Sequence, residues 1–161
     1  VYLRTMREGT PVIYGNDETF PIGGSKVLRQ SDDDRVAIVA AGVTVHEALK
    51  AYDELRRDGI SARVIDAYSI KPIDAETLRE AAAATGAIVT VEDHYPAGGL
   101  GEAVLSALAD RPVPVTILAV NKTPMSGTGD QLRDYAGISA GRIVDTVRRL
   151  AATEAALAGP H

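Results

Sequence analysis

Three consecutive residues with acid–base side chains, Glu92, Asp93 and His94, come directly after a short apolar β-branched run at residues 87–91. The run predicts a buried strand, and its carboxyl end is where open α/β sheets bind ligands. A carboxylate beside an imidazole can transfer protons in catalysis. The same residues can equally fix a loop or a subunit contact, and neither a nucleophile motif nor a second histidine lies nearby in the sequence. We therefore favour a structural role for them.

A glycine-rich stretch, G-G-L-G at residues 98–101, follows this strand and opens a predicted helix over residues 99–109. Helix N-termini can bind anions because their first backbone N–H groups have no partner within the helix. A nucleotide-binding loop, however, needs the spacing G-x-G-x-x-G in the first turn after a strand, which is not the spacing here. We therefore interpret these glycines as positions where the helix packs closely on its own loop.

Arginines and histidines are the other side chains suited to binding. Arg4 and Arg7 lie in an irregular N-terminal stretch, and a planar guanidinium suits phosphate because it can donate two hydrogen bonds at once. Most surface arginines, however, are only solvated. The histidines are His46, His94 and His161, and their spacing is not that of metal ligands. We expect His46 to be a surface or packing residue and His161 to be disordered, and we predict no metal site.

The composition argues against several classes of function. The chain has 161 residues, of which 45% are hydrophobic, and this suits one domain with a single core. The net charge is −5 and there is no basic run, which argues against nucleic-acid binding. No apolar run approaches the roughly 20 residues of a membrane span, and the N-terminus lacks the apolar stretch of a signal peptide. The absence of cysteine fits a reducing compartment, so we predict a cytoplasmic protein.

A regular alternation of strands and helices begins near residue 26. Apolar runs predict strands over residues 26–30, 35–41, 62–66, 87–91 and 115–119, and amphipathic stretches predict helices over residues 45–58, 74–85, 99–109 and 129–135 and from residue 139 onward. A polar turn at residues 31–34 joins the first two strands. A connection this short predicts an antiparallel hairpin between those two strands.

Capping residues mark the ends of several of these helices. Thr44 and Glu47 match the T-x-x-E capping box at the start of the first helix. Asp74 is the expected N-cap of the second helix, and Gly86 provides its left-handed end. Ser139 is the expected cap of the last helix.

Together these elements predict a three-layer α/β/α sandwich. Strands that alternate with helices of about ten to fifteen residues pair in parallel through right-handed crossovers. Near-continuous apolar strands imply that helices cover both faces of the sheet. With the hairpin included, the prediction is a mixed five-stranded sheet of four parallel strands and one antiparallel strand.

Residues 1–24 differ from the rest of the chain. The run E-G-T-P-V-I-Y-G-N-D-E-T-F-P-I-G-G is rich in glycine and proline and follows neither helical nor strand periodicity. Such a segment usually connects or wraps other structure. We therefore interpret residues 1–24 as the end of a preceding domain followed by an interdomain linker, and residues 25–161 as one domain. This interpretation implies that an N-terminal portion is missing.

Five stretches taken together resemble the C-terminal domain of transketolase. They are Y-L-R-T-M-R-E-G-T-P-V-I-Y (2–14), A-A-G-V-T-V-H-E-A-L (40–49), I-D-A-Y-S-I-K-P-I-D (65–74), V-E-D-H-Y-P-A-G-G-L-G-E-A-V (91–104) and L-A-V-N-K-T-P-M-S-G (118–127). They occur in the order of that family and span nearly the whole chain. The same domain occurs in 1-deoxyxylulose-5-phosphate synthase and in the β subunits of 2-oxoacid dehydrogenases, but V-E-D-H-Y and P-M-S-G favour transketolase.

The resemblance implies a role for one residue of this chain. In transketolase the second arginine of the R-x-x-R pair contacts the phosphate of the sugar substrate, and Arg7 matches it. The family's G-D-G…N diphosphate–metal motif does not occur in the chain, and its sugar-handling histidines and thiamine-activating glutamate belong to the two preceding domains. The resemblance therefore implies no catalytic, cofactor-binding or metal-binding residue here, and thiamine diphosphate with Mg²⁺ or Ca²⁺ for the complete enzyme.

The activity that the resemblance implies is transfer of a two-carbon ketol unit from ketose phosphates to aldose phosphates, in the pentose phosphate pathway. The expected partners are the N-terminal thiamine-binding domains, in the same chain or in a separate subunit, and the complete enzyme is expected to be a homodimer. The isolated chain is expected to be inactive. The alternatives are a non-catalytic assembly or regulatory module, or the equivalent domain of the synthase or dehydrogenase relatives.

Overall fold

The protein is an alternation of strands and helices in a computed structural model that describes residues 1–6 and 9–158. Its strands are β1 (Lys26–Arg29), β2 (Val36–Ala40), β3 (Ala62–Asp66), β4 (Ile88–Val91) and β5 (Val115–Leu118). Its helices are α1 (Val43–Arg57), α2 (Ala75–Thr85), α3 (Leu100–Ala107), α4 (Gly129–Ala136) and α5 (Ala140–Ala158). The strands form one sheet in the order β1-β3-β2-β4-β5, in which only β1 is antiparallel to its neighbour. The predicted mixed sheet is confirmed.

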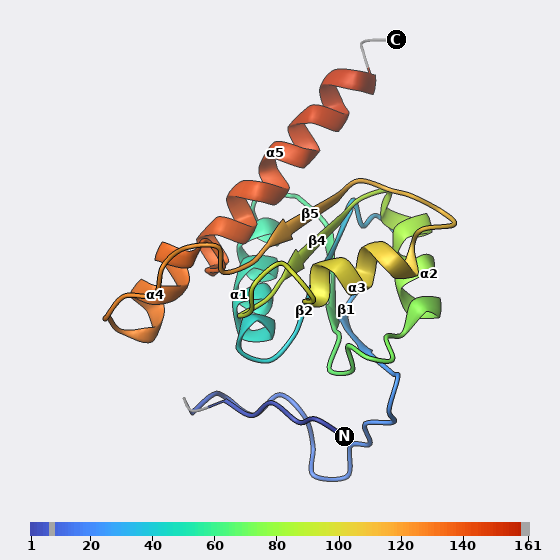
Figure 1. The fold of residues 1–161 in the computed structure, drawn as a ribbon. Helices are drawn as coiled ribbons and strands as arrows, with labels where there is room; N and C mark the ends of the chain where they lie inside the picture. The colour runs from blue at the N-terminus through green and yellow to red at the C-terminus, as the bar shows by residue number, and fades with distance from the viewer. Residues whose placement is uncertain (7–8, 159–161) are drawn as a thin grey trace.

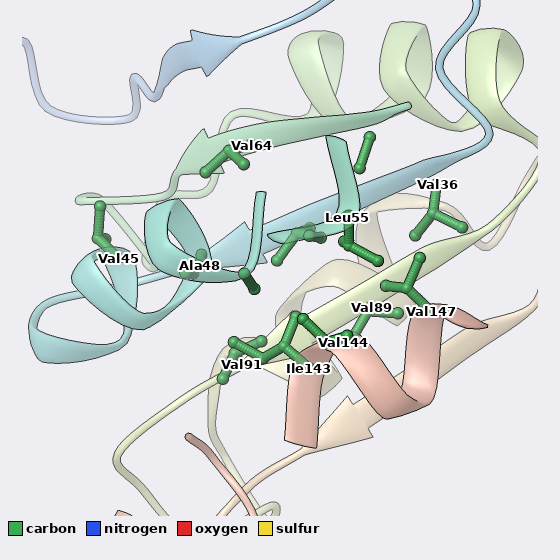
Figure 2. Packing of buried hydrophobic residues seen from close by; sticks show 14 of the residues in the cluster. Val36, Val45, Ala48, Leu55, Val64, Val89, Val91, Ile143, Val144 and Val147 are labelled. Carbon is green, nitrogen blue, oxygen red and sulfur yellow. The ribbon is translucent and has the colours of Figure 1, made fainter. Parts of the chain in front are cut away.

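Helices cover both faces of this sheet (Figure 1). Successive side chains of a strand point to opposite faces, so in β2 Val36 and Ile38 join a core under α1 and α5, while Ala37 and Val39 join a core under α2 and α3. Figure 2 shows the first of these cores. Each fully buried Leu, Ile or Val stabilises the fold by roughly 1.5–3 kcal/mol. The two cores make the three-layer sandwich that the apolar strands predict.

The predicted hairpin between the first two strands is wrong. β1 pairs with β3, with Lys26 opposite Asp66, and β2 lies between β3 and β4. All five positions of β2 are buried, whereas β1 alternates between half-buried and exposed residues. The apolar strand therefore takes the centre of the sheet and the mixed strand takes an edge. The turn that connects β1 to β2 passes the end of β3, which lies between them in the sheet. In this turn the Asp34 carboxylate accepts a hydrogen bond from the Ser31 amide and lies 3.3 Å from Nε of Arg63 in β3.

The capping predictions are confirmed for α2 and wrong for α1. The Asp74 carboxylate accepts a hydrogen bond from the Thr77 amide at 3.1 Å, and Gly86 ends α2 in the left-handed conformation. Helix α1 instead follows Gly42, which has a φ of 63° and provides no side-chain cap. Thr44 therefore lies inside the helix and cannot cap it.

Glu47, the other half of the predicted capping box, caps a different helix. Its side chain is buried, and Oε2 accepts a hydrogen bond at 2.9 Å from the amide of Ala140, the first residue of α5. Its Oε1 lies 3.4 Å from Nε of Arg133 in α4. Ser139 precedes α5 as expected, but its hydroxyl donates to Asp134. A carboxylate is favoured at this helix start because the free amides carry partial positive charge.

The N-terminal segment packs along the loop that follows β3. The Phe20 ring contacts the rings of Tyr14 and Tyr68 edge-on, with centroids 5.0 Å apart in both pairs. The Tyr68 hydroxyl donates to the backbone carbonyl of Pro21 at 3.1 Å. Residues on both sides of the predicted boundary at residue 25 therefore contact each other, and the boundary itself stays a prediction.

Within residues 1–6 and 9–158, no helix has the length and apolar character needed to cross a membrane.

Candidate functional site

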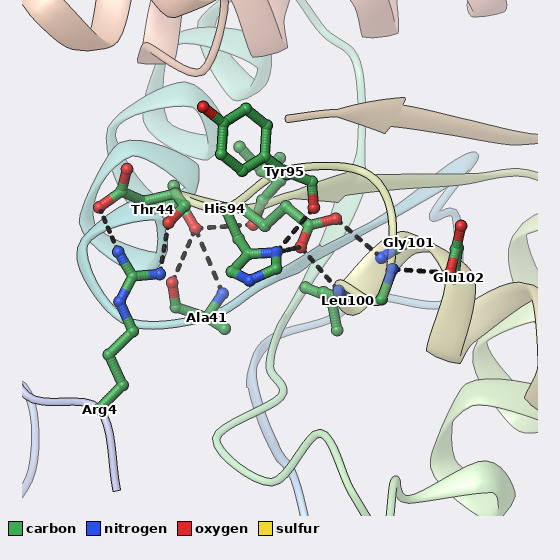
Figure 3. A network of polar contacts seen from close by, with 12 residues as sticks. Arg4, Ala41, Thr44, His94, Tyr95, Leu100, Gly101 and Glu102 are labelled. Carbon is green, nitrogen blue, oxygen red and sulfur yellow. Dashed lines mark hydrogen bonds and ion pairs between the residues drawn. The ribbon is translucent and has the colours of Figure 1, made fainter. Parts of the chain in front are cut away.

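The carboxyl end of β4 carries a network of polar contacts that joins distant parts of the chain (Figure 3). Glu92, the residue after β4, is only 3% exposed. Its Oε2 accepts a hydrogen bond from the Leu100 amide at 2.7 Å, and its Oε1 accepts one from the Gly101 amide at 2.9 Å. The anion at the N-terminus of α3 is therefore a side chain of the protein itself, which stabilises the helix start through charge and hydrogen bonding.

The glycines at the start of α3 allow this close approach. A Cβ at Gly99 would lie 2.8 Å from the carbonyl oxygen of Tyr95, and one at Gly101 would lie within 2.8 Å of three Ile117 side-chain atoms. Real Cβ atoms do not approach other atoms so closely, so any larger residue would push α3 away from β5 and from Glu92. The interpretation of the glycines as packing positions is confirmed for Gly99, which packs on the loop, and Gly101 packs on β5 instead; a Cβ at Gly98 would contact nothing within 4 Å.

Asp93 and His94 make different contacts: Asp93 pairs with Arg4, whereas Nδ1 of His94 lies 3.9 Å from Oε2 of Glu92. The guanidinium of Arg4 donates from Nη1 to the Asp93 backbone carbonyl at 2.5 Å, and its Nη2 lies 3.3 Å from Oδ2 of Asp93. Nδ1 of His94 lies 2.7 Å from the carbonyl oxygen of Tyr95 and therefore carries the proton. We call Arg4, Glu92, Asp93 and His94 the strand-end cluster. Its carboxylates are engaged with a helix start and an arginine, which supports the structural role over acid–base catalysis.

Thr44 ties the cluster to the centre of the sheet. Its buried hydroxyl lies 2.7 Å from the carbonyl oxygen of Val91 and 2.9 Å from that of Ala41, and it accepts a hydrogen bond from the Ala41 amide. The ends of β2 and β4 and the start of α1 are thus held together. The sequence marks this threonine only as a cap, because a contact across 47 residues leaves no local pattern.

Asp66, at the end of β3, is a further buried carboxylate, and no pattern in the sequence singled it out. It is 6% exposed, and its Oδ2 accepts a hydrogen bond from the Tyr14 hydroxyl at 2.6 Å, while Oδ1 has no hydrogen-bond partner. Burial raises the pKa of Asp66, although the Tyr14 hydrogen bond and the nearby charges of His46 and Lys26 oppose the rise. Burial and the contact with Asp66 also raise the pKa of the Tyr14 phenol. This contact fastens the N-terminal segment to the sheet.

The pH dependence of stability tests the state of Asp66. Because the pKa of Asp66 is raised in the folded protein, protonation of its carboxyl stabilises the folded state. This stabilisation is complete below the pKa of the unfolded state and is lost as pH rises through the folded-state pKa. We expect Asp66→Asn to lose stability relative to the wild type as pH falls toward 3.8, the ordinary pKa of aspartate. Each unit of raised pKa corresponds to about 1.4 kcal/mol. Urea unfolding of both proteins from about pH 8 to about pH 4 measures the difference in free energy of unfolding.

Asp74→Asn is the matched control because its pKa moves the other way. Burial by itself would raise the pKa of Asp74, but hydrogen bonds from the Thr77 amide and from the hydroxyls of Ser25 and Thr77 lower it overall. The stabilisation that ionised Asp74 provides is therefore lost on acidification. The stability of Asp74→Asn should rise relative to that of the wild type as pH falls. A pH-independent difference for Asp66→Asn would contradict the raised pKa.

The other predicted binding residues do not join these carboxylates in a metal site. In the described part of the chain, no group of three or more His, Cys, Asp or Glu side chains is placed to hold a metal ion. His46 is a half-buried residue of α1, as expected of a packing position. Arg7 and His161 lie outside the described residues. The phosphate-binding role of Arg7 therefore stays a prediction.

Comparison with known proteins agrees with the resemblance seen in the sequence. Residues 25–143 match the family model for the C-terminal domain of transketolase. Transketolase-like protein 1 of Bos taurus is 50% identical over 151 residues, covering 92% of this chain and 25% of the relative. Transketolase of Homo sapiens is 46% identical over 151 residues, covering 92% of this chain and 24% of the relative. The chain thus spans about a quarter of the length of these curated relatives.

Solved structures show the same fold. A structure described as a split gene transketolase, inactive beta4 tetramer, is 40% identical with a TM-score of 0.83, covering 89% of this chain and 47% of that chain. Transketolase from Campylobacter jejuni has a TM-score of 0.61 at 14% identity, covering 87% of this chain and 20% of that chain, and supports the fold alone. On the strength of the family match over residues 25–143, the chain belongs to the transketolase C-terminal domain family.

Proposed function

We propose that this chain is the C-terminal domain of a transketolase that moves a two-carbon ketol unit from ketose phosphates to aldose phosphates. The observation that carries the proposal is the family match over residues 25–143, together with 46% identity to human transketolase. The complete enzyme would be a cytoplasmic homodimer. In it this domain would brace the assembly and present Arg7 to the phosphate of the substrate, where the paired donors of a guanidinium suit a phosphomonoester.

The thiamine diphosphate and divalent metal of the family do not fit the residues described here. Within those residues no cluster of potential ligands is placed to hold a metal ion. The start of α3, which by geometry could receive a diphosphate, already receives the carboxylate of Glu92. We therefore propose that the preceding thiamine-binding domains hold the cofactor, and that this chain contributes no group to the carbon–carbon bond chemistry.

A separately encoded subunit is the second candidate arrangement. The structure that matches at a TM-score of 0.83 is described as a split gene transketolase, whose inactive tetramer contains beta chains. A protein of this kind would act as a non-catalytic assembly module until a thiamine-binding chain joins it. The two arrangements share the same chemistry and differ only in whether a peptide bond joins the parts.

Reconstitution tests the proposed function directly. The isolated chain should transfer no ketol unit between a ketose phosphate and an aldose phosphate in the presence of thiamine diphosphate and Mg²⁺. Activity is expected once transketolase N-terminal thiamine-binding domains are added, and those domains alone are the control. Ketol transfer by the isolated chain would contradict the proposal, and activity only with pyruvate as donor would favour the equivalent domain of the synthase or dehydrogenase relatives.

A further inference from the structure

A hollow of about 570 Å³ lies between α4, the first turn of α5 and the loop after β5, and we call it the α4 hollow. Pockets that bind small molecules typically have volumes of about 300–1,000 Å³. All the residues that line the hollow have polar side chains: Lys122, Asp130, Gln131, Asp134, Tyr135 and Arg142. The ligand that suits the hollow is therefore decided by which of these polar groups the protein itself already engages.

Both carboxylates of the α4 hollow are engaged by donors of the protein. Oδ1 of Asp130 lies 2.6 Å from Nη2 of Arg133, whose side chain is only 12% exposed. Oδ1 of Asp134 accepts a hydrogen bond from the Ser139 hydroxyl at 3.0 Å and lies 3.3 Å from Nε of Arg142. These internal pairs offset the negative charge of the hollow, so a bound cation would have to compete with arginines that are already in place.

The two cations of the hollow keep donors to spare. The ammonium of Lys122 lies over the ring of Tyr135, 4.7 Å from its centroid, and pairs with no carboxylate among the described residues. Arg142 uses Nε for Asp134, and within the described part of the chain its two terminal nitrogens have no hydrogen-bond partner. Ammonium and guanidinium groups form short, charge-assisted hydrogen bonds with carboxylate and phosphate oxygens. The unused binding capacity of the hollow is therefore for an oxyanion.

Helix α4 is the wall that such a ligand would stabilise most. None of its eight residues is buried, so polar contacts rather than a core hold it in place. Figure 1 shows α4 beside the start of α5. An anion held by Lys122 and Arg142 would bridge the two segments that precede and follow α4 in the sequence. Because the bridge is lost when α4 detaches, bound anion should protect α4 against local unfolding.

We propose that the α4 hollow binds a small doubly charged oxyanion through the ammonium of Lys122 and the terminal nitrogens of Arg142. Two cations from different elements suit a ligand that presents charged oxygens on more than one side, such as a phosphomonoester or a small dicarboxylate. The site shares no residue with the strand-end cluster, and the proposal does not depend on the proposed function of the chain. It assigns the hollow to binding of an effector that acts on α4.

NMR titration of the full chain at low ionic strength tests the site, with inorganic phosphate in one series and succinate in another. We expect saturating shifts of the amides at residues 121–123 and 129–142, with a Kd on the order of 1 mM because the contacts are exposed to water. Tighter binding of phosphate identifies a phosphomonoester as the ligand class, and tighter binding of succinate identifies a dicarboxylate. At about ten times Kd, hydrogen exchange of the α4 amides should slow about tenfold.

Single substitutions of the two cations make the test specific. Lys122→Met and Arg142→Gln should each weaken anion binding about three- to tenfold. Arg148→Gln is the matched control, because this arginine is also on α5 and 44% exposed but is engaged by Asp58 at 2.6 Å and Glu54 at 3.2 Å. Its affinity should equal that of the wild type. Shifts that do not saturate with either anion up to about 20 mM, or the same loss of affinity in all three variants, would overturn the proposal.

Discussion

The Glu92→Gln variant is expected to lose about 2–4 kcal/mol of free energy of unfolding. The carboxylate is almost fully buried and accepts from the amides of Leu100 and Gly101, one with each oxygen. Glutamine has nearly the same shape but only one acceptor, and its amide nitrogen would face a backbone donor. One buried N–H group is then left without a partner, and the negative charge that complements the start of α3 is lost.

Glu102→Gln provides the matched control on the same helix. Glu102 also accepts from a backbone amide at the start of α3, that of Gly98 at 2.7 Å, but this contact is exposed. Water can replace the lost acceptor, so a loss below about 1 kcal/mol is expected. Urea unfolding at one pH gives both values, with unchanged denaturant slopes indicating comparable unfolded states. Equal losses for the two variants would mean that burial of Glu92 is not what makes its contacts strong.

The second large effect is expected in substrate binding, from Arg7→Ala in the complete enzyme. Removal of one charged contact to a phosphate should cost about 1.5–3 kcal/mol, which corresponds to a rise of roughly 10- to 150-fold in KM for phosphorylated sugars. The carbon–carbon chemistry lies with other residues under this proposal, so kcat should change much less. Steady-state kinetics with an aldose phosphate and with the same aldose lacking phosphate measure the effect.

Two comparisons make this result specific. KM for the unphosphorylated aldose should be the same in the wild type and in Arg7→Ala, because only the phosphate contact is removed. Arg7→Lys should recover part of the loss, since lysine restores the charge without the paired donors. Unchanged KM for phosphorylated sugars in Arg7→Ala would remove the phosphate assignment, although the family membership of the chain would stand.

Patterns that depend on neighbours in the sequence were sufficient to predict the elements. The apolar run at residues 62–66 predicts β3 at its observed bounds, because every second side chain of a strand must find one of the two cores. Asp74 and Gly86 predict the ends of α2 because each acts on amides or dihedral angles within a few residues. The packing role of the α3 glycines was predictable for the same reason, since their spacing excludes a nucleotide loop.

Contacts between distant residues were not predictable in this way. Glu47 has the right spacing to cap its own helix, yet it caps α5, 93 residues away, because α1 begins before Thr44. The Tyr14–Asp66 hydrogen bond spans 52 residues, and neither a lone tyrosine nor a lone aspartate in the sequence indicates its partner. Arg4 meets Asp93 across 89 residues. Each partner is identifiable only once the sheet has brought the two segments together.

The sequence by itself determined the layers, the helix and strand order and the family resemblance, because hydrophobic period and turn residues act locally and the motifs are contiguous. The tertiary structure decided which strand lies beside which, which carboxylate meets which helix start, and where the N-terminal segment is held. The physical reason is competition for burial. All five side chains of β2 are apolar, so this strand takes the centre of the sheet, where they are buried. The mixed strand β1 is left with the edge beside β3. That arrangement sets Lys26, the first residue of β1, opposite Asp66, the last residue of β3.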